Sequence, residues 1–184
     1  MQAHLKLENI VKGCLNANRE SQDSFYRYFY TFCFSACMSY CQTSDDVREV
    51  VNDGFLKIFK NLQSFNARYD NFERSLKGWV KKIMINTAID HYQKCRKNYF
   101  LNNVHKDVFE LSSSEETGMD KFYYKDILKL VQRLSPSYRV VFNLYAIEGF
   151  KHEEIAKELN ISVGTSKSNL ARARMHIQKM IQYQ

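Results

Sequence analysis

Six hydroxyl and basic side chains near the C-terminus have the chemistry and spacing of a helix that contacts DNA. They are Ser162, Thr165, Lys167, Ser168, Arg172 and Arg174. Hydroxyl groups and helix-terminal amides hydrogen-bond phosphates, while arginine and lysine can reach phosphates or guanine edges in a major groove. The simpler alternative is an ordinary helical hairpin with a solvated basic face. The capping, turn and charge signals agree with one another, which favours the DNA-binding interpretation.

The elements that would position these side chains lie within EEIAKELNISVGTSKSNLARAR. Glu153 to Leu159 predicts a short helix, and Asn160 can take the left-handed conformation of a tight turn. Ser162 with Thr165 then caps a longer basic helix. Five apolar residues would set the two helices against each other: Ile155, Ala156, Leu159, Ile161 and Leu170. Short helix, turn and longer helix together predict a helix-turn-helix.

A second segment that could bind nucleic acid lies upstream of the helix-turn-helix and combines a basic helix with an aromatic loop. On a helix predicted from Ser75 to about Lys97, four polar side chains can share one stripe: Lys82, Asn86, Gln93 and Lys97. The loop before that helix carries Phe65 and Tyr69, which could stack on unpaired bases of single-stranded DNA. On residue pattern alone, packed aromatic residues and solvated charges are the simpler interpretation.

Two further helices are predicted upstream of this segment. Aromatic and apolar residues recur at helical spacing from Ser24 to Cys41. Thr43 to Asp46 predicts a capping box with Asp in place of Glu, and the helix that follows turns Glu49, Asn52 and Asp53 to solvent. Its apolar face would comprise Val47, Val50, Val51, Phe55, Ile58, Phe59 and Leu62.

The chain as a whole is predicted to be all-α, with two small helical domains joined by a flexible linker. One proline and six glycines in 184 residues leave few turns for a many-stranded sheet. The polar, serine-rich stretch 98–120 is the expected linker between domains at 1–97 and 121–184. In the second domain, Ser135 and Pro136 predict a helix start, and Gly149 predicts the end of that helix.

Composition and cysteine usage narrow the class of protein. A net charge of +7 favours a polyanionic partner. Five cysteines without a CxxC pair indicate a reducing compartment, so we expect a cytoplasmic protein. We see no signal peptide and no apolar run long enough for membrane insertion.

No catalytic or metal site is expected. Cys33, Cys37 and Cys41 rise along one helix and cannot converge on a tetrahedral ion without other elements, so we interpret them as buried. His91 and Cys95, one turn apart, are expected on a solvated or DNA-facing helix. The sequence therefore predicts no cofactor, no metal and no enzymatic activity.

Two long segments resemble the sigma factors of bacterial RNA polymerase. SDDVREVVNDGFLKIFKNLQSF with GWVKKIMINTAIDHYQKCRK resembles sigma region two, and LSPSYRVVFNLYAIEGFKHEEIAKELNISVGTSKSNLARARMHIQKM resembles region four. The order, the spacing and the absence of additional domains resemble the extracytoplasmic-function group. The resemblance implies a subunit that binds core polymerase, opens the minus-ten promoter element and reads the duplex minus-thirty-five element.

The resemblance also implies roles for individual residues. The polymerase-contact helix matches at Asp46, Glu49, Asn52, Asp53 and Phe55, with Asn52 in place of the more usual Gln. The implied minus-ten residues are Phe65, Tyr69, Lys82, Asn86, Gln93 and Lys97, with Gln93 where an Arg is common. The implied minus-thirty-five residues are the six on the helix-turn-helix named above. Lys151 stands where the family often has a capping Ser.

The partners implied are the clamp helices of the largest polymerase subunit, the flap of the second large subunit, promoter DNA and an anti-sigma factor. The main alternative is an operator-binding regulator that never enters the polymerase. A second alternative is an interaction module or decoy that docks on polymerase without directing transcription.

Overall fold

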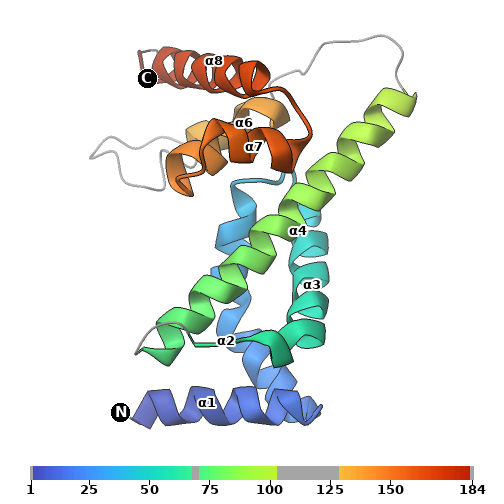
Figure 1. The fold of residues 1–184 in the computed structure, drawn as a ribbon, viewed down its shortest axis with the longest axis vertical. Helices are drawn as coiled ribbons and strands as arrows, with labels where there is room; N and C mark the ends of the chain where they lie inside the picture. Colours follow the sequence, from blue (N-terminus) through green and yellow to red (C-terminus); the bar gives the residue numbers. More distant parts are fainter. Residues whose placement is uncertain (1, 68–70, 103–128, 183–184) are drawn as a thin grey trace. The chain divides into compact units, whose positions relative to one another are not determined.

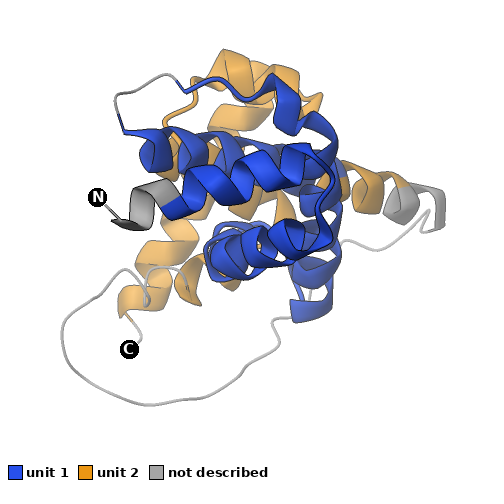
Figure 2. Ribbon diagram, turned by 90° about the horizontal axis from the view of Figure 1, so that it is seen from below, with its two compact units in different colours: residues 1–90 blue, residues 91–184 orange. Residues whose placement is uncertain are grey.

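The computed structural model describes residues 2–67, 71–102 and 129–182, and all regular secondary structure in these ranges is helical. The all-α prediction is thereby confirmed. The chain divides into two compact units, residues 1–90 and 91–184 (Figure 2). The boundary falls inside α4, Phe72–Asn102. Of the expected linker, residues 98–102 belong to α4 and the remainder lies outside the described residues.

Unit 1 is built from helices that pack against their neighbours in the chain (Figure 1). They are α1 (Gln2–Leu15), α2 (Arg19–Met38), α3 (Ser44–Asn61), the short 3-10 turn η1 (Leu62–Ser64) and the first part of α4. The capping box predicted at the start of α3 is present. The Asp46 amide donates to Thr43 Oγ1, and the Thr43 amide donates to Asp46 Oδ2, each at 3.1 Å.

The core of unit 1 combines aromatic residues of α2 with aliphatic residues of α3 and α4. Its fully buried members include Phe25, Phe29, Val50, Val51, Ile58, Leu76, Val80 and Met84. Gly54 allows α3 and α4 to approach closely, because a side chain there would collide with the sulfur of Met84. Trp79 and Ile83 of α4 are half-buried.

Helix α4 is longer at both ends than its periodicity predicts. It begins at Phe72 because Asn71 caps it: Asn71 Oδ1 accepts from the Arg74 amide at 2.9 Å, and its carbonyl accepts from Ser75. It continues to Asn102 because residues 98–102 contain neither Gly nor Pro to stop it.

Beyond α4, the described part of unit 2 is a small helical bundle that lies within the predicted second domain. Its elements are α6 (Pro136–Phe142), the π-helical turn η2 (Asn143–Ile147), α7 (His152–Leu159) and α8 (Val163–Gln182), with α6 and α7 both packed on α8. Pro136 occupies the first turn of α6 as predicted, although the Ser135 side chain makes no capping bond. Gly149, with φ +76°, follows the turn that ends at Ile147.

The guanidinium of Arg139 is buried in this bundle, where it donates hydrogen bonds to backbone carbonyls of the segment before α6. Its Nη2 donates to the carbonyls of Gln132 and Leu134 at 2.6 and 2.9 Å. These bonds tie the start of α6 to the segment before it. In the described part of the chain, no helix combines the length and hydropathy of a membrane span.

Candidate nucleic-acid interfaces and a partner-binding face

The helix-turn-helix of unit 2 forms as the sequence predicts. Helix α7 ends at Leu159, and Asn160 takes the left-handed conformation with φ 50° and ψ 55°. The amide of Ile161 then returns to the Ala156 carbonyl at 3.0 Å, which closes the turn. Of the five predicted apolar contacts, Ile155, Ala156, Leu159 and Leu170 are buried and Ile161 is half-buried.

A polar contact that sequence reasoning missed fixes α7 on α8. Ser166 is fully buried, and its hydroxyl lies 2.9 Å from Nδ1 of His152 at the start of α7. The His152 ring stacks on Tyr145 of η2, with ring centroids 4.6 Å apart and planes 23° apart. Because a buried hydroxyl needs a hydrogen-bond partner, this pair sets the position of α7 along α8.

The first turn of α8 has the predicted hydroxyl cap. Ser162 Oγ accepts from the Thr165 amide at 2.9 Å, and the two hydroxyls lie 2.8 Å apart. Ser168 donates to the Thr165 carbonyl at 3.0 Å. Ser162, Thr165, Lys167 and Ser168 are all exposed on this end of the helix. An exposed helix start with hydroxyls and a cation is suited to a phosphate.

The two arginines of α8 are both exposed but have different partners. Arg172 Nη1 donates to the hydroxyl of Tyr138 on α6 at 3.3 Å. The ring of Tyr138 also stacks on His176, one turn beyond Arg172, with centroids 5.7 Å apart. The guanidinium of Arg174 lies over the ring of Tyr145, 5.6 Å from its centroid.

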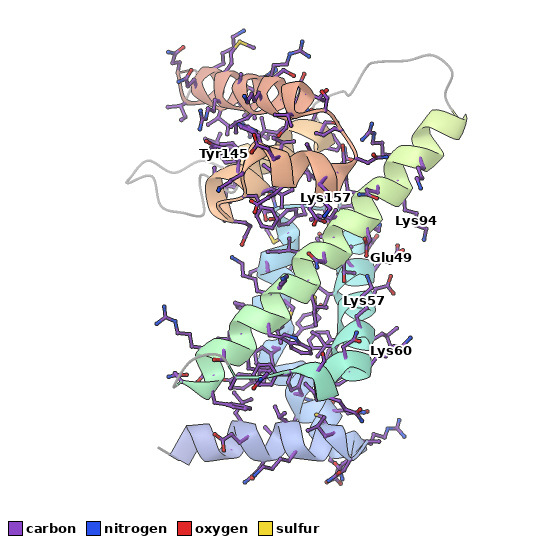
Figure 3. The ribbon with its side chains drawn as sticks, in the orientation of Figure 1. Glu49, Lys57, Lys60, Lys94, Tyr145 and Lys157 are labelled. Carbon is purple, nitrogen blue, oxygen red and sulfur yellow. The ribbon has the colours of Figure 1, made fainter. Side chains whose placement is uncertain are left out.

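This difference separates two residues that sequence reasoning treated alike. A guanidinium with one hydrogen bond to a phenol keeps most of its donors for another partner. A guanidinium over an aromatic face is held in a cation–π contact with the protein itself. Figure 3 labels Tyr145, which lies in the same unit as α8. Both guanidinium groups remain exposed, with Arg172 in contact with Tyr138 of α6 and Arg174 in contact with Tyr145 of η2.

Lys151, which replaces a capping Ser of the family, leaves half of a capping box at the start of α7. Its backbone is extended, and its amide donates to Oε2 of Glu154 at 2.7 Å. A lysine side chain has no acceptor, so the reciprocal bond to the Glu154 amide cannot form.

The predicted polymerase face lies on α3, where Glu49, Asn52 and Asp53 are exposed (Figure 3 labels Glu49). Asp46 is half-buried, and its Oδ2 already serves the capping box. Phe55 must be reassigned from the face to the core below it, since only 3% of its surface is exposed.

Leu56 was missed by sequence reasoning. It is 69% exposed on α3, one turn after Asn52 and Asp53. It therefore adds an apolar side chain to an acidic and amide-bearing face. Helical spacing from Glu49 through Asp53 could have found it, because residues three and four apart lie on one face.

The predicted minus-ten residues lie on α4 and in the loop before it. Lys82 and Asn86 are exposed in the unit 1 part of α4, and Lys97 is exposed and Gln93 half-buried in the unit 2 part. Tyr69 lies outside the described residues. Phe65 is half-buried, and its ring contacts Phe72 and Trp79 with centroid distances of 5.6 and 5.5 Å. The ring of Phe65 therefore packs against the first part of α4.

Cys33, Cys37 and Cys41 are buried as predicted, although Cys41 lies beyond α2, which ends at Met38. Cys33 and Cys37 are fully buried and Cys41 nearly so. Burial raises the pKa of the Cys33 thiol to about 12 and also raises that of Cys37, which neighbouring thiols raise further. Such thiols stay protonated and pack as small apolar groups.

Two models of known protein families match this chain, one in each of its two units. The family model of Sigma-70 region 2 matches residues 25–98, which cover most of α2, all of α3 and most of α4. The model of Sigma-70, region 4 matches residues 124–177, which include the helix-turn-helix. The chain belongs to the sigma-70 family. Similarity along most of the chain to factors of the extracytoplasmic-function (ECF) group places this sigma factor in that group.

Its relatives include an ECF RNA polymerase sigma-E factor from Escherichia coli (strain K12), 25% identical over 157 residues that cover 76% of this chain and 75% of the relative. The Haemophilus influenzae sigma-E factor is 23% identical over 151 residues, covering 75% and 76%. A solved sigma factor RpoE from Bartonella quintana, in complex with the anti-sigma factor NepR, has the same fold. Its TM-score is 0.50 at 22% identity, over 87% of this chain and 96% of that one.

Proposed function

We propose that this sigma factor binds bacterial core RNA polymerase and directs it to promoters, where transcription starts. The observation that carries the proposal is the presence of both sigma regions, in order, on one chain. A simple operator-binding regulator needs the helix-turn-helix but not the α3 and α4 surfaces of region 2. Nucleotide addition belongs to the polymerase, so the sigma factor itself is no enzyme, and it acts in the cytoplasm beside the chromosome.

In unit 1, the exposed face of α3 would bind the clamp helices of the largest polymerase subunit. Glu49 and Asp53 supply negative charge, which favours a basic partner surface. Asn52 between them can both donate and accept hydrogen bonds. The exposed Leu56 adds the apolar contact that a buried interface centre needs.

The minus-ten element would be opened and held along α4. Lys82 and Lys97 are cations that can hold phosphates. Gln93, at the position where an Arg is common, donates its amide to the Glu158 carbonyl at 2.5 Å and would offer its side-chain oxygen as an acceptor. The exposed amide of Asn86 can donate to and accept from the edge of an unstacked base. Phe65 and Tyr69 would complete the base pocket in the preceding loop.

The minus-thirty-five element would take the start of α8 in its major groove. Ser162, Thr165 and Ser168 offer hydroxyls to phosphates, and Lys167 and Arg172 can reach phosphates or base edges. The remaining member of the predicted set, Arg174, would support the helix through Tyr145. The end of unit 2 would also contact the flap of the second large polymerase subunit.

An anti-sigma factor is the expected regulator. The Bartonella relative was solved with such a protein, NepR. Occlusion of the α3, α4 and α8 surfaces would be sufficient to block polymerase and DNA together.

The test is reconstituted transcription. Purified chain is added to sigma-free bacterial core polymerase with a library of linear promoters, and wild type is compared with Asn86→Ala and Arg172→Ala. Lys12→Ala, which removes an exposed cation from α1, is the matched control. We expect transcripts that begin downstream of a shared two-part promoter element. Asn86→Ala and Arg172→Ala should reduce the amount of these transcripts, and Lys12→Ala should leave it unchanged. Core binding without transcripts would support the decoy alternative, and no core binding would support the operator-binding regulator.

A further inference from the structure

Helix α4 carries one carboxylate within a surface that is otherwise basic and amide-bearing. Among residues 75–97, Asp90 is the only acidic residue beside six lysines and arginines. Lys82, Asn86 and Asp90 follow one another at four-residue spacing, which puts them on one stripe of the helix, and all three are exposed. A negative charge on a stripe that binds DNA repels the phosphates and lowers the affinity for DNA of any sequence.

The carboxylate of Asp90 is held in place by Lys57 of α3, which Figure 3 labels. Nζ of Lys57 donates to Oδ2 of Asp90 at 2.7 Å, and the two side chains are 43% and 66% exposed. An ion pair this exposed contributes little to stability, because water competes for both charges. The close approach of α3 to α4 depends instead on the contact of Gly54 with Met84. The ion pair therefore serves mainly to orient the carboxylate on the stripe.

A carboxylate on this stripe distinguishes between bases by hydrogen bonding. It only accepts hydrogen bonds and has about four acceptor positions on its two oxygens, so the bond to Lys57 leaves it able to accept from a second donor. Cytosine and adenine present an exocyclic amino group, whereas guanine and thymine present a carbonyl oxygen in its place. The carboxylate of Asp90 therefore favours the amino bases and repels the carbonyl oxygens. The amide of Asn86, which both donates and accepts, does not discriminate in this way.

We propose that Asp90 is a specificity-determining residue of the minus-ten surface. Its carboxylate accepts a hydrogen bond from the exocyclic amino group of a cytosine or adenine in the minus-ten element. Lys57 is a positioning residue, which orients the carboxylate and offsets its charge beside the phosphates. This inference rests on the proposed function, since it adds base discrimination to the proposed minus-ten surface.

The experiment measures base preference with the full-length chain and sigma-free bacterial core polymerase. Linear promoters randomised in the minus-ten element are transcribed, and the transcripts are sequenced to give the preference at each position. Asp90→Ala removes the acceptor, and Asp90→Asn keeps the size of the side chain but adds a donor. Asp23→Asn is the matched control, because Asp23 forms a similarly exposed ion pair with Arg27 on α2, at 2.9 Å. Circular dichroism melting of each variant reports whether it is folded.

We expect Asp90→Ala to reduce the preference for an amino base about tenfold at one minus-ten position and to leave the other positions unchanged. Asp90→Asn should admit guanine or thymine at that same position, because the carboxamide can donate to their carbonyl oxygens. Lys57→Ala should weaken the same preference by a smaller factor, about threefold, and Lys57→Arg should restore it. Asp23→Asn should leave every preference within about twofold of wild type.

Two results would overturn the inference while the proposed function stands. One is a wild-type preference that both Asp90 variants keep at every position. The other is an equal loss of preference at all positions together with a lower melting temperature, which is the signature of a purely structural ion pair. If the wild-type chain directs no promoter-specific transcripts with core polymerase, the proposed function itself fails.

Discussion

Completing the capping box of α7 should stabilise this protein. Lys151 has an extended backbone, as Thr43 does at the start of α3. At α3 the Thr43 hydroxyl accepts from the third amide of the helix, whereas at α7 the corresponding amide of Glu154 has no acceptor in the Lys151 side chain. A serine at position 151 would supply one while leaving the existing bond from the 151 amide to Glu154 in place.

The magnitude follows from the two changes that Lys151→Ser makes. A side-chain cap contributes about 1 kcal/mol, and removal of a cation from a helix start adds about 0.3 kcal/mol or more. Lys151 is exposed, so little packing is lost. An increase of about 1 kcal/mol in the free energy of unfolding raises the melting temperature of a domain of about 60–100 residues by about 4–8 °C.

Lys151→Ala is the control that isolates the cap, because it removes the same charge without adding an acceptor. We would measure thermal unfolding of the full chain by circular dichroism and exchange of the Glu154 amide hydrogen by NMR. The Ser variant should melt above the Ala variant and protect that amide. Equal melting temperatures and equal exchange rates for the two variants would refute the capping argument.

Three other predictions concern DNA recognition and the buried thiols. Arg172→Ala should weaken binding to minus-thirty-five DNA about tenfold, a loss of about 1.4 kcal/mol, whereas Arg174→Ala should lower stability by about 0.5–1 kcal/mol with a smaller effect on binding. Fluorescence anisotropy and melting curves distinguish the two, and equal effects on both readouts would contradict the assignment. Tyr138→Phe should reduce binding about threefold through loss of the bond that orients Arg172, and should have no effect in an Arg172→Ala background. At pH 8 a thiol reagent should label the exposed Cys95 rapidly and Cys33 only on unfolding. The pKa of Cys33 is about 12 in the folded protein against an ordinary 9.0. The contribution of the buried thiol to the free energy of unfolding should therefore be fully present below pH 9 and be lost as the pH rises toward 12. Rapid labelling of Cys33 in the native protein would show that α2 opens more readily than its packing indicates.

Local sequence determined the elements that depend on residues three or four positions apart. The capping box at the start of α3 and the left-handed turn at Asn160 are such features, because the groups that form them are near neighbours in the chain. Helical periodicity also placed Phe55 with the buried residues of α3. The family resemblance transferred it to the polymerase face, and its burial shows that periodicity was the better guide.

Tertiary structure decided the contacts between residues far apart in the chain. Tyr138 reaches Arg172 across 34 positions and Tyr26 reaches Asn52 across 26, so no local pattern contains either pair. The different partners of Arg172 and Arg174 depend on which side of α8 faces α6 and η2. The sequence by itself therefore determined most of the helices, the caps at Thr43 and Ser162 and the membership of the sigma family. Packing of those helices decided which polar side chains are held by the protein and which remain for polymerase and DNA, because helix faces acquire partners only when the helices meet.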